Sequence, residues 1–193
     1  MLGLFNVKSF IMEGDELVII DTGFNGSSAA NIIRKLGDLG RTIDDVSLCV
    51  LTHAHDDHIG GLRSLKEKGD FLVASHEAEV SSIEKKTGIE VDLSLVDEQK
   101  IAGMSILYLP GHTLGNISIL VEKTLITGDT VVRGADELKL SNKFFTHDIE
   151  TAKASVIHLE NYDFESIMFS HGNDVNTGGK EMILNLIRKL EQN

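Results

Sequence analysis

Apolar segments that end on metal-binding side chains place the strongest constraint on how this chain of 193 residues can fold. Four short apolar runs, at 46–51, 104–109, 124–127 and 166–169, have the length and composition of buried strands. A side chain of a type that binds zinc, iron or manganese follows each run, and these are His53, His112, Asp129 and His171. We therefore expect a fold in which several strands end at one edge of the sheets and deliver these side chains to one site.

The segment 53–58 is the densest part of this pattern, with three histidines and two aspartates among six residues. His53 and His55 are two residues apart, so on an extended segment they point the same way. Asp57 and His58 follow where the chain turns. All four side chains can bind one ion only with severe strain, so two ions sharing this loop are the easier arrangement.

The three ligands from the other strand ends complete a two-ion site. His112 and His171 add one imidazole to each ion, and the Asp129 carboxylate can bridge the ions. Seven ligands for two ions leave room for a water molecule between them. That open position is kept by catalytic zinc sites and is absent from structural ones.

The composition is that of an ordinary globular domain, with 41% hydrophobic and 25% charged residues. We expect a single domain over residues 1–193, because this length can bury a sizeable core. A general nucleic-acid binder needs a basic face, so the net charge of −12 argues against a nucleic-acid partner. A small anionic substrate stays compatible with this charge, since bound metal ions reverse the sign of the local field.

Other features favour the cytoplasm. No apolar run approaches the roughly 18 residues that a membrane span needs, so we expect no membrane partner. The first residues lack the basic stretch and apolar core of a signal peptide. The one cysteine, Cys49, excludes an internal disulfide and lies in an apolar run, which predicts a core residue. The oligomeric state has no signal in the sequence.

Strands and helices are interleaved along the chain. The pattern predicts strands at 1–12, 17–20, 46–51, 71–74, 104–109 and 166–169, and a hairpin from 117–121 and 124–127. It predicts helices at 27–39, 61–69, 77–86, 148–159 and 180–190, the first with Ser27 or Ser28 as N-cap and Gly40 as its stop. This mixture indicates an α/β (α+β) fold in which helices cover a mixed sheet core.

Taken in order, the motifs resemble those of the metallo-β-lactamase superfamily of hydrolases, in its glyoxalase II-like and lactonase-like branch. Residues 53–58 match H-x-H-x-D-H, and Pro110-Gly111-His112-Thr113 matches the PGHT segment. Gly128-Asp129 and Ser170-His171-Gly172 match the third and fourth motifs, and Asp21-Thr22-Gly23 is similar to an early signature. The resemblance extends over about residues 4–190.

The resemblance implies a four-layer αββα sandwich with the metal site at one edge of its two sheets. It implies two divalent metal ions per chain, zinc being expected and iron or manganese being alternatives. The first ion would be bound by His53, His55 and His112. The second would be bound by Asp57, His58 and His171, and Asp129 would bridge both ions.

A binuclear hydrolysis mechanism follows from such a site. Two ions share a hydroxide and lower the pKa of its parent water, the hydroxide attacks an ester-type carbonyl, and a metal stabilises the developing oxyanion. The resemblance supports Asp57 as the catalytic residue that moves a proton to the leaving group.

Three residues are candidates for orienting the ligands from behind, because ligating histidines usually donate their other N–H to a carboxylate or carbonyl. These are Asp21, Thr52 and Ser118. The simpler interpretations are that Asp21 starts a turn and that Thr52 is an ordinary strand residue.

The remaining histidines, His76, His147 and His158, are expected in packing or surface roles, with His76 at a helix cap. We expect Tyr108 to pack in the core. Phe144 and Phe145 either line a substrate pocket or anchor their loop.

The favoured function is hydrolysis of a small ester, thioester or lactone. Glutathione thioesters are the less favoured thioesters, because residues 130–137 lack the Gly-Arg segment of glutathione-using relatives and only a short stretch follows His171. The alternatives are an oxidoreductase similar to the persulfide dioxygenases, which use one iron, and a phosphodiesterase or nuclease of the same fold. A β-lactamase proper would carry an export signal. A metal-binding module without catalysis is a further alternative.

Overall fold

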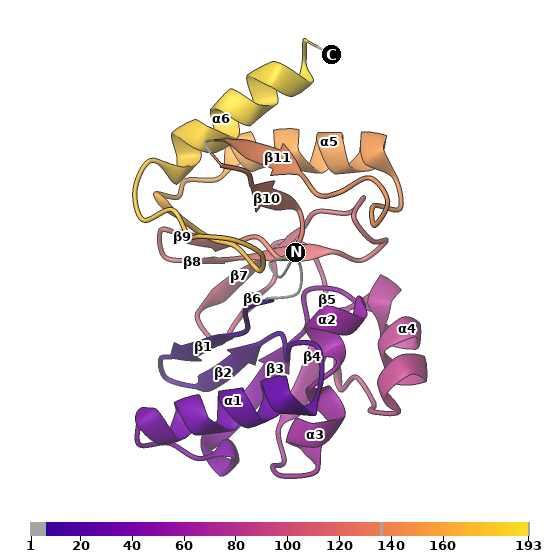
Figure 1. Cartoon of the computed structure of the whole chain (residues 1–193), viewed down its shortest axis with the longest axis vertical. Helices are drawn as coiled ribbons and strands as arrows, with labels where there is room; N and C mark the ends of the chain where they lie inside the picture. Colours follow the sequence, from indigo (N-terminus) through magenta and orange to yellow (C-terminus); the bar gives the residue numbers. More distant parts are fainter. Residues whose placement is uncertain (1–6, 136, 193) are drawn as a thin grey trace. The chain divides into compact units, whose positions relative to one another are not determined.

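A computed structural model describes residues 7–135 and 137–192 of the chain (Figure 1). The chain divides into two compact units, Met1–Leu95 and Val96–Asn193, which we call the N-terminal unit and the C-terminal unit. Each unit contains a five-stranded sheet and its own hydrophobic core. Among the described residues there is no helix with the length and apolar character needed to cross a bilayer.

The N-terminal unit is built on a sheet with the strand order β1-β2-β3-β4-β5. These strands are β1 Phe10–Glu13, β2 Leu17–Ile20, β3 Val46–Val50, β4 Leu72–His76 and β5 Leu93–Leu95. β1 and β2 pair antiparallel, and the other pairs are parallel. The connecting helices are α1 Gly26–Asp38, the 3-10 helix η1 Ile43–Asp45, α2 Asp56–Ile59, α3 Leu62–Lys66 and α4 Glu77–Thr87. The carboxyl ends of β2, β3 and β4 therefore share one edge of the sheet.

Side-chain alternation along the strands explains the core of the N-terminal unit. Successive strand residues point to opposite faces, and the odd-numbered apolar residues of β2, β3 and β4 belong to one hydrophobic cluster with α1, α3 and α4. Figure 1 shows α1 and α3 on one side of this sheet. The cluster includes Leu17, Ile19, Cys49, Val73, Leu36, Leu62 and Ile83. It fixes the sheet edge from which the segment 53–58 leaves.

The C-terminal unit has a second sheet, with the order β12-β9-β8-β7-β6. Its strands are β6 Lys100–Ile101, β7 Met104–Tyr108, β8 Ile117–Val121, β9 Thr124–Ile126 and β12 Ser166–Met168. β12 runs parallel to β9, and the other neighbours pair antiparallel. β10 Val131–Arg133 and β11 Leu138–Leu140 form a separate hairpin. The helices are α5 Ile149–His158, the 3-10 helix η2 Leu159–Asn161 and α6 Gly179–Leu190.

The core of the C-terminal unit repeats the same arrangement. Odd-numbered residues of β7, β9 and β12 pack against α5, η2 and α6 in one cluster. Its members include Leu107, Leu125, Ile167, Val156, Leu159, Ile183 and Ile187. Figure 1 shows α5 and α6 on the side of the unit that carries β10 and β11.

The structure agrees with the predicted strands and helices to within a few residues and corrects several details. The N-cap of α1 is Asn25, whose side chain accepts hydrogen bonds from the N–H groups of Ser27 and Ser28 at 2.9 and 3.3 Å; the predicted serine caps were wrong. Residues 56–59, expected as a turn, form α2. The short strands β5, β6, β10 and β11 had no prediction. The predicted first strand, 1–12, lies partly outside the described residues, and its described part begins at Phe10.

Candidate metal centre

Asp21 lies where β2 ends and is held against the end of β3. Its N–H donates to the carbonyl of Val50 at 2.9 Å. Its φ of 55° is in the left-handed region, which is uncommon for residues other than glycine. This backbone turns the carboxylate toward Thr52, whose N–H donates to Oδ1 and whose hydroxyl donates to Oδ2, both at 2.8 Å. Asp21 therefore does more than start a turn, and Thr52 does more than fill a strand position.

His58 is fixed through both its backbone and its ring. The N–H and the hydroxyl of Thr22 donate to the His58 carbonyl at 2.7 and 2.9 Å. On the ring, Nδ1 lies 2.7 Å from Oδ2 of Asp21, and both side chains are fully buried. A carboxylate on one ring nitrogen directs the other nitrogen toward a metal. In His58 that other atom is Nε2, which lies 3.8 Å from the Asp57 carboxylate.

Two glycines allow the segment carrying His58 to lie this close to the end of β2. A Cβ atom on Gly60 would lie 1.9 Å from the Phe24 carbonyl oxygen, and one on Gly61 would lie 2.2 Å from that of Thr22. Real Cβ atoms do not approach other atoms so closely. The separation between Asp21 and His58 thus depends on residues without side chains.

The imidazoles of His53 and His55, predicted from their spacing to point the same way, lie next to each other at the end of β3. Nε2 of His53 lies 3.1 Å from Nδ1 of His55, and the ring centroids of His53 and His58 are 4.0 Å apart. The Thr52 hydroxyl lies 3.1 Å from Nδ1 of His53, so Nε2 is the atom that faces His55. The N-terminal unit therefore gathers His53, His55, Asp57 and His58 into one cluster.

Two side chains of α4 reach this cluster and had no signal in the sequence pattern. The Glu79 carboxylate accepts the N–H of Ala54 at 2.8 Å. Lys86 donates to the Ala54 carbonyl at 2.8 Å and pairs with Asp56 at 2.8 Å. Glu79 is 3% exposed, but the sequence does not distinguish it from the other glutamates of α4, and its role becomes recognisable only when the helix is placed beside the loop.

In the C-terminal unit three strand ends meet, as the sequence predicted for these strands. β7 and β9 are both antiparallel to β8, and β12 is parallel to β9, so their carboxyl ends share one edge. The register pairs Ile126 with Met168, and Asp129 and His171 each lie three residues beyond this pair. His112 follows β7 in the same direction.

The three side chains converge on one carboxylate oxygen. Oδ2 of Asp129 lies 3.5 Å from Nε2 of His112 and 3.6 Å from Nε2 of His171. His112 and Asp129 are buried, and His171 is partly exposed. Asp129 thus lies between two imidazoles, at distances that suit ligands of a metal ion.

A network of neutral polar groups holds the segments of His112 and Asp129 together. The buried Asn116 amide donates to the Leu109 carbonyl at 2.9 Å and to the Thr130 hydroxyl at 2.8 Å. Ser118, a candidate for orienting a ligand, contacts the Thr127 carbonyl and the Thr130 hydroxyl at 2.9 and 3.0 Å. Ser118 therefore supports the loop of Asp129, and Asn116, absent from the sequence-based candidates, does the same.

The PGHT turn packs against the start of α5. Gly111 has a φ of 125°, and a Cβ atom there would lie 2.2 Å from the backbone nitrogen of Ala152. Ser155 donates to the Pro110 carbonyl at 2.6 Å. The N–H groups of His147 and Asp148 donate to the carbonyls of His112 and Gly111, both at 2.9 Å. The chain before α5 is thereby fastened to the backbone of His112.

Phe144 and Phe145 lie on a turn before α5 and are 82% and 67% exposed. They do not anchor the loop by burial. The turn is closed by Asn142, whose side chain accepts the N–H of Phe144 at 3.0 Å and whose carbonyl accepts the N–H of Phe145 at 2.9 Å. A fixed backbone therefore presents two aromatic rings to solvent.

Other predicted positions have ordinary roles. His76 caps α4 by accepting the Ala78 N–H at 3.3 Å. His158 ends α5 and lies 3.2 Å from the Tyr162 hydroxyl. Tyr108 is only partly buried, which corrects its predicted core role, and its hydroxyl donates to the Leu114 carbonyl at 3.0 Å. Cys49 is buried, and burial raises the pKa of its thiol.

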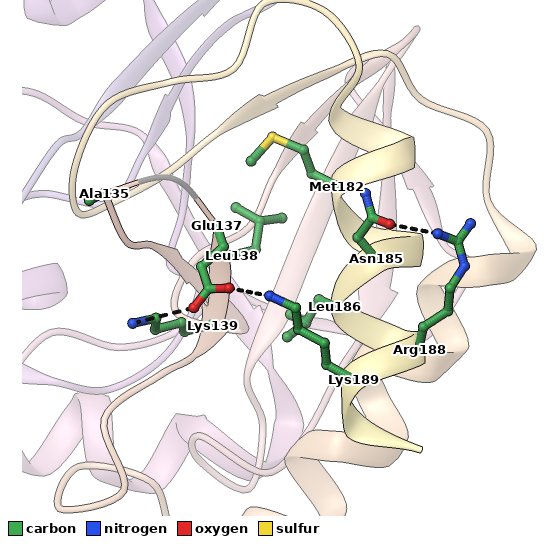
Figure 2. Close-up of a pocket in the computed structure, with 9 residues that line it drawn as sticks. All are labelled: Ala135, Glu137, Leu138, Lys139, Met182, Asn185, Leu186, Arg188 and Lys189. Carbon is green, nitrogen blue, oxygen red and sulfur yellow. Dashed lines mark hydrogen bonds and ion pairs between the residues drawn. The ribbon is translucent and has the colours of Figure 1, made fainter. Parts of the chain in front are cut away.

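A pocket away from these clusters lies between β11 and α6 (Figure 2). Its volume is about 690 Å³. Glu137 lies between Lys139 and Lys189 in this pocket and pairs with both. Both lysines of this pocket are thus paired with Glu137, and Arg188 pairs with Glu181 at 3.2 Å. The predicted site residues lie elsewhere.

The donor atoms fit divalent metal ions on their own chemistry. Ligands about 2.0–2.2 Å from a tetrahedral zinc ion lie roughly 3.3–3.6 Å from one another. The pairs around Asp129, at 3.5 and 3.6 Å, match this separation, and the pair His53–His55 comes within a few tenths of an ångström of it. Imidazole and carboxylate donors suit zinc, iron and manganese.

The sequence model of the Metallo-beta-lactamase superfamily matches residues 2–171. The chain belongs to this superfamily. A probable metallo-hydrolase of Bacillus subtilis (strain 168) is 28% identical over 181 residues, covering 86% of this chain and 80% of that protein. A hydroxyacylglutathione hydrolase of Klebsiella pneumoniae is 38% identical over 87 residues, covering 44% of this chain and 33% of that protein.

Solved structures of the superfamily share the fold of this chain. A metallo-β-lactamase from Pseudomonas aeruginosa, in a mono-zinc form, gives a TM-score of 0.77 at 22% identity, covering 96% of this chain and 84% of the other. One from Pontibacter korlensis gives 0.78 at 19% identity, with 97% and 88% covered. The predicted superfamily, fold class and enzyme class, a metal-dependent hydrolase, are confirmed. The number and identity of the ions and the individual ligands stay predictions.

Proposed function

We propose that the chain is a binuclear metal-dependent hydrolase of a small ester, thioester or lactone, and that the two ligand clusters form one site. The observation that carries this proposal is the convergence of His112 and His171 on a single oxygen of Asp129. One carboxylate oxygen at this distance from two imidazoles supports a shared ligand for two ions. The same spacing also suits three ligands of one ion, so the preference for two ions comes from the number of ligands.

The ligand count supports the same assignment. Catalytic zinc ions take three protein ligands and keep one position open. His53, His55 and His112 would hold the first ion, and Asp57, His58 and His171 would hold the second. Asp129 would join the two.

The chain's own residues supply orientation and proton transfer. The bound ions would supply a bridging hydroxide at neutral pH and neutralise the negative charge that develops on the substrate carbonyl oxygen. Asp21 fixes the ring of His58 so that Nε2 faces Asp57. Asp57, partly exposed, is placed to carry a proton to the leaving group.

One relative favours acyl substrates over the alternatives. The match to a hydroxyacylglutathione hydrolase, an enzyme named for a thioester substrate, supports a thioester or related acyl compound. It covers less than half of this chain, so glutathione itself is not part of the proposal. Persulfide oxidation at one iron would leave part of this histidine-rich ligand set without a function.

The exposed turn before α5 supports an apolar acyl group in the substrate. His147, two residues after Phe145, is hydrogen-bonded to the backbone of His112. Two residues of extended chain span at most about 7 Å, so the backbone of Phe145 lies a short distance from the backbone of His112, a proposed ligand. Leu114, also exposed, lies two residues after His112.

The proposal extends to the type of substrate, the cellular location, the domain organisation and the metal. The substrate is a small molecule rather than a nucleic acid, which the net charge of −12 supports. The cytoplasm is the proposed location, and one domain over 1–193 is the proposed organisation. Zinc is the proposed metal, and elemental analysis of the purified protein identifies it.

A screen of thioesters, lactones, carboxylic esters, phosphodiesters and β-lactams with the metal-loaded protein tests the reaction class. We expect close to two ions per chain and turnover of acyl substrates. The variant Asp129→Ala should abolish hydrolysis and lower the occupancy of both ions, because it removes the shared ligand. Retained turnover in Asp129→Ala would reject the bridging role. A protein that contains no metal after incubation with zinc, iron or manganese would reject the metal-dependent hydrolase.

A further inference from the structure

The peptide groups on both sides of Ala54 are held by two side chains from α4. Glu79 accepts the Ala54 N–H at 2.8 Å, and Lys86 donates to the Ala54 carbonyl at 2.8 Å. Ala54 lies between His53 and His55 in the sequence. It has no chemistry of its own, yet two charged side chains are directed to its backbone.

These two hydrogen bonds fix the link between the two histidines. The N–H of Ala54 belongs to the peptide plane shared with His53, and its carbonyl belongs to the plane shared with His55. Peptide planes are rigid, and only the dihedral angles at Ala54 connect them. Anchoring both planes therefore sets the angles at Ala54 and with them the separation of the two imidazoles.

The geometry of α4 allows two of its side chains to bind the Ala54 backbone at the same time. Glu79 and Lys86 are seven residues apart, which is about two helical turns, so both side chains lie on one face of the helix. Lys86 also pairs with Asp56, the first residue of α2, at 2.8 Å. The same helix face thus reaches both the His53–His55 segment and the start of the helix that carries Asp57 and His58.

The burial of Glu79 is the second observation. The residue is 3% exposed, and a carboxylate loses much hydration energy when it is buried. A neutral residue would avoid this cost if only packing were needed. A buried carboxylate directed to the backbone between two ligands indicates a positioning role.

We propose that Glu79 and Lys86 are positioning residues that set the spacing of His53 and His55 and thereby the affinity for the ion that this pair binds. The inference rests on the proposed metal site. For Glu79 we expect the effect to be confined to the first ion, because Asp21 and Thr22 hold His58 independently of α4.

Metal titrations of four variants of the full chain test the proposal. Glu79→Ala should weaken binding of the first ion about 10- to 100-fold, the range for residues that support a ligand from behind. Glu79→Gln keeps an oxygen acceptor for the Ala54 N–H and should restore most of the affinity. Lys86→Met should cause a smaller loss, because the Lys86 side chain is 43% exposed and solvent screens its interactions.

Glu84→Ala is the matched control on the same helix. Glu84 accepts the N–H of Val91 at 3.3 Å, away from the ligands, so this variant removes a comparable bond without touching Ala54. Its metal affinity should equal that of the wild type. Cobalt(II) as the probe adds a spectrum, in which Glu79→Ala should alter the bands of the first bound ion and leave those of the second unchanged.

Hydrogen exchange of the Ala54 amide in the metal-free protein provides a readout that requires no metal. Glu79→Ala should accelerate this exchange, and Glu84→Ala should not. Wild-type affinity in Glu79→Ala, or an equal loss in Glu79→Gln and Glu79→Ala, would overturn the positioning role. Unaltered exchange of the Ala54 amide in Glu79→Ala would also overturn it, because Glu79 would then not hold this peptide group. If the wild type bound no metal, the proposed function would fail instead.

Discussion

At the scale of single residues, Asp21 joins three parts of the N-terminal unit through one carboxylate. It accepts hydrogen bonds from the backbone and hydroxyl of Thr52 and contacts Nδ1 of His58 at 2.7 Å. To make these contacts, Asp21 adopts a left-handed backbone conformation with a φ of 55°. Such strain persists only where surrounding contacts hold it.

We predict that Asp21→Ala weakens binding of the ion that His58 holds by about 10- to 100-fold, because the ring loses the partner that fixes its orientation. Competition titration with a zinc-binding dye measures this affinity. Asp163→Ala is the control, since Asp163 is an exposed residue paired with Lys123. Equal affinities in the two variants would show that Asp21 does not orient the ligand.

The two exposed phenylalanines give a prediction about substrate choice. Burying an aromatic or aliphatic side chain against an apolar group is worth about 1.5–3 kcal/mol. The double variant Phe144→Ala/Phe145→Ala should therefore lose about 10- to 100-fold in kcat/KM for octanoyl esters and little for acetyl esters. Kinetics on a series of acyl chain lengths measures the difference.

Two comparison variants separate this effect from a general loss of apolar surface. Leu72→Ala removes a side chain that is 49% exposed on β4, and the dependence on acyl length should be unchanged. Replacing both phenylalanines by leucine should retain most of the preference for long chains. A loss of equal size for acetyl and octanoyl esters would mean that the turn does not bind the acyl group.

At the scale of elements, the contact between the PGHT turn and α5 sets the position of His112. We predict that Gly111→Ala destabilises the protein by roughly 1–3 kcal/mol, because its Cβ would overlap α5 and its backbone would be strained. It should also weaken metal binding by displacing His112. Urea unfolding of the metal-free protein measures the stability.

Gly37→Ala is the control for a glycine substitution. Gly37 lies in α1, and nothing lies within 4 Å of an added Cβ. Alanine in a helix is favoured over glycine by up to about 1 kcal/mol, so this variant should be neutral or more stable. A free energy of unfolding equal to that of the wild type in Gly111→Ala would mean that the PGHT turn can shift away from α5 without destabilising the protein.

The helices α1 and α6 and the strands β2, β3 and β7 were predictable because their sequences record burial. The helices have apolar residues at helical spacing, and the strands are short, largely apolar runs that are mostly buried. β5, β6, β10 and β11 have two or three residues each, and none of them lies in an apolar run like those that predicted the equally short β9 and β12. Their existence is decided by neighbouring strands rather than by their own sequence.

At the scale of the whole molecule, the proposed ligands are divided between the two compact units. The N-terminal unit carries four of them, and the C-terminal unit carries three. Metal binding should then couple the stability of one unit to ligands on the other. A ligand present at 100 times its dissociation constant stabilises a folded protein by about 2.7 kcal/mol.

We predict that bound metal slows the alkylation of Cys49, which is in the N-terminal unit, and that Asp129→Ala in the C-terminal unit removes this protection. Cys49 is fully buried, and burial raises the pKa of its thiol, so it reacts only when the unit opens. Alkylation by iodoacetamide, followed by mass spectrometry, measures the rate in protein freed from excess metal. Equal protection of wild type and Asp129→Ala would argue against a shared site.

The ligand types could be predicted from sequence because each follows a strand directly. Asp21 was predictable for the same reason, since it ends β2. Glu79, Lys86 and Asn116 could not be predicted, because their importance comes from which backbone groups they reach in space. A glutamate in a helix and an asparagine before a strand have many ordinary roles, and only the packed structure distinguishes among them.

The glycine pair after His58 has a consequence for how this protein tolerates mutation. Any side chain at Gly60 or Gly61 would overlap a carbonyl group near the end of β2, so no substitution there is conservative. A complete mutational scan should rank these two positions beside the histidines, although neither has a side chain that could bind a metal ion. Positions in this loop can therefore be intolerant to substitution because the backbone is tightly packed, and not only because a side chain binds metal.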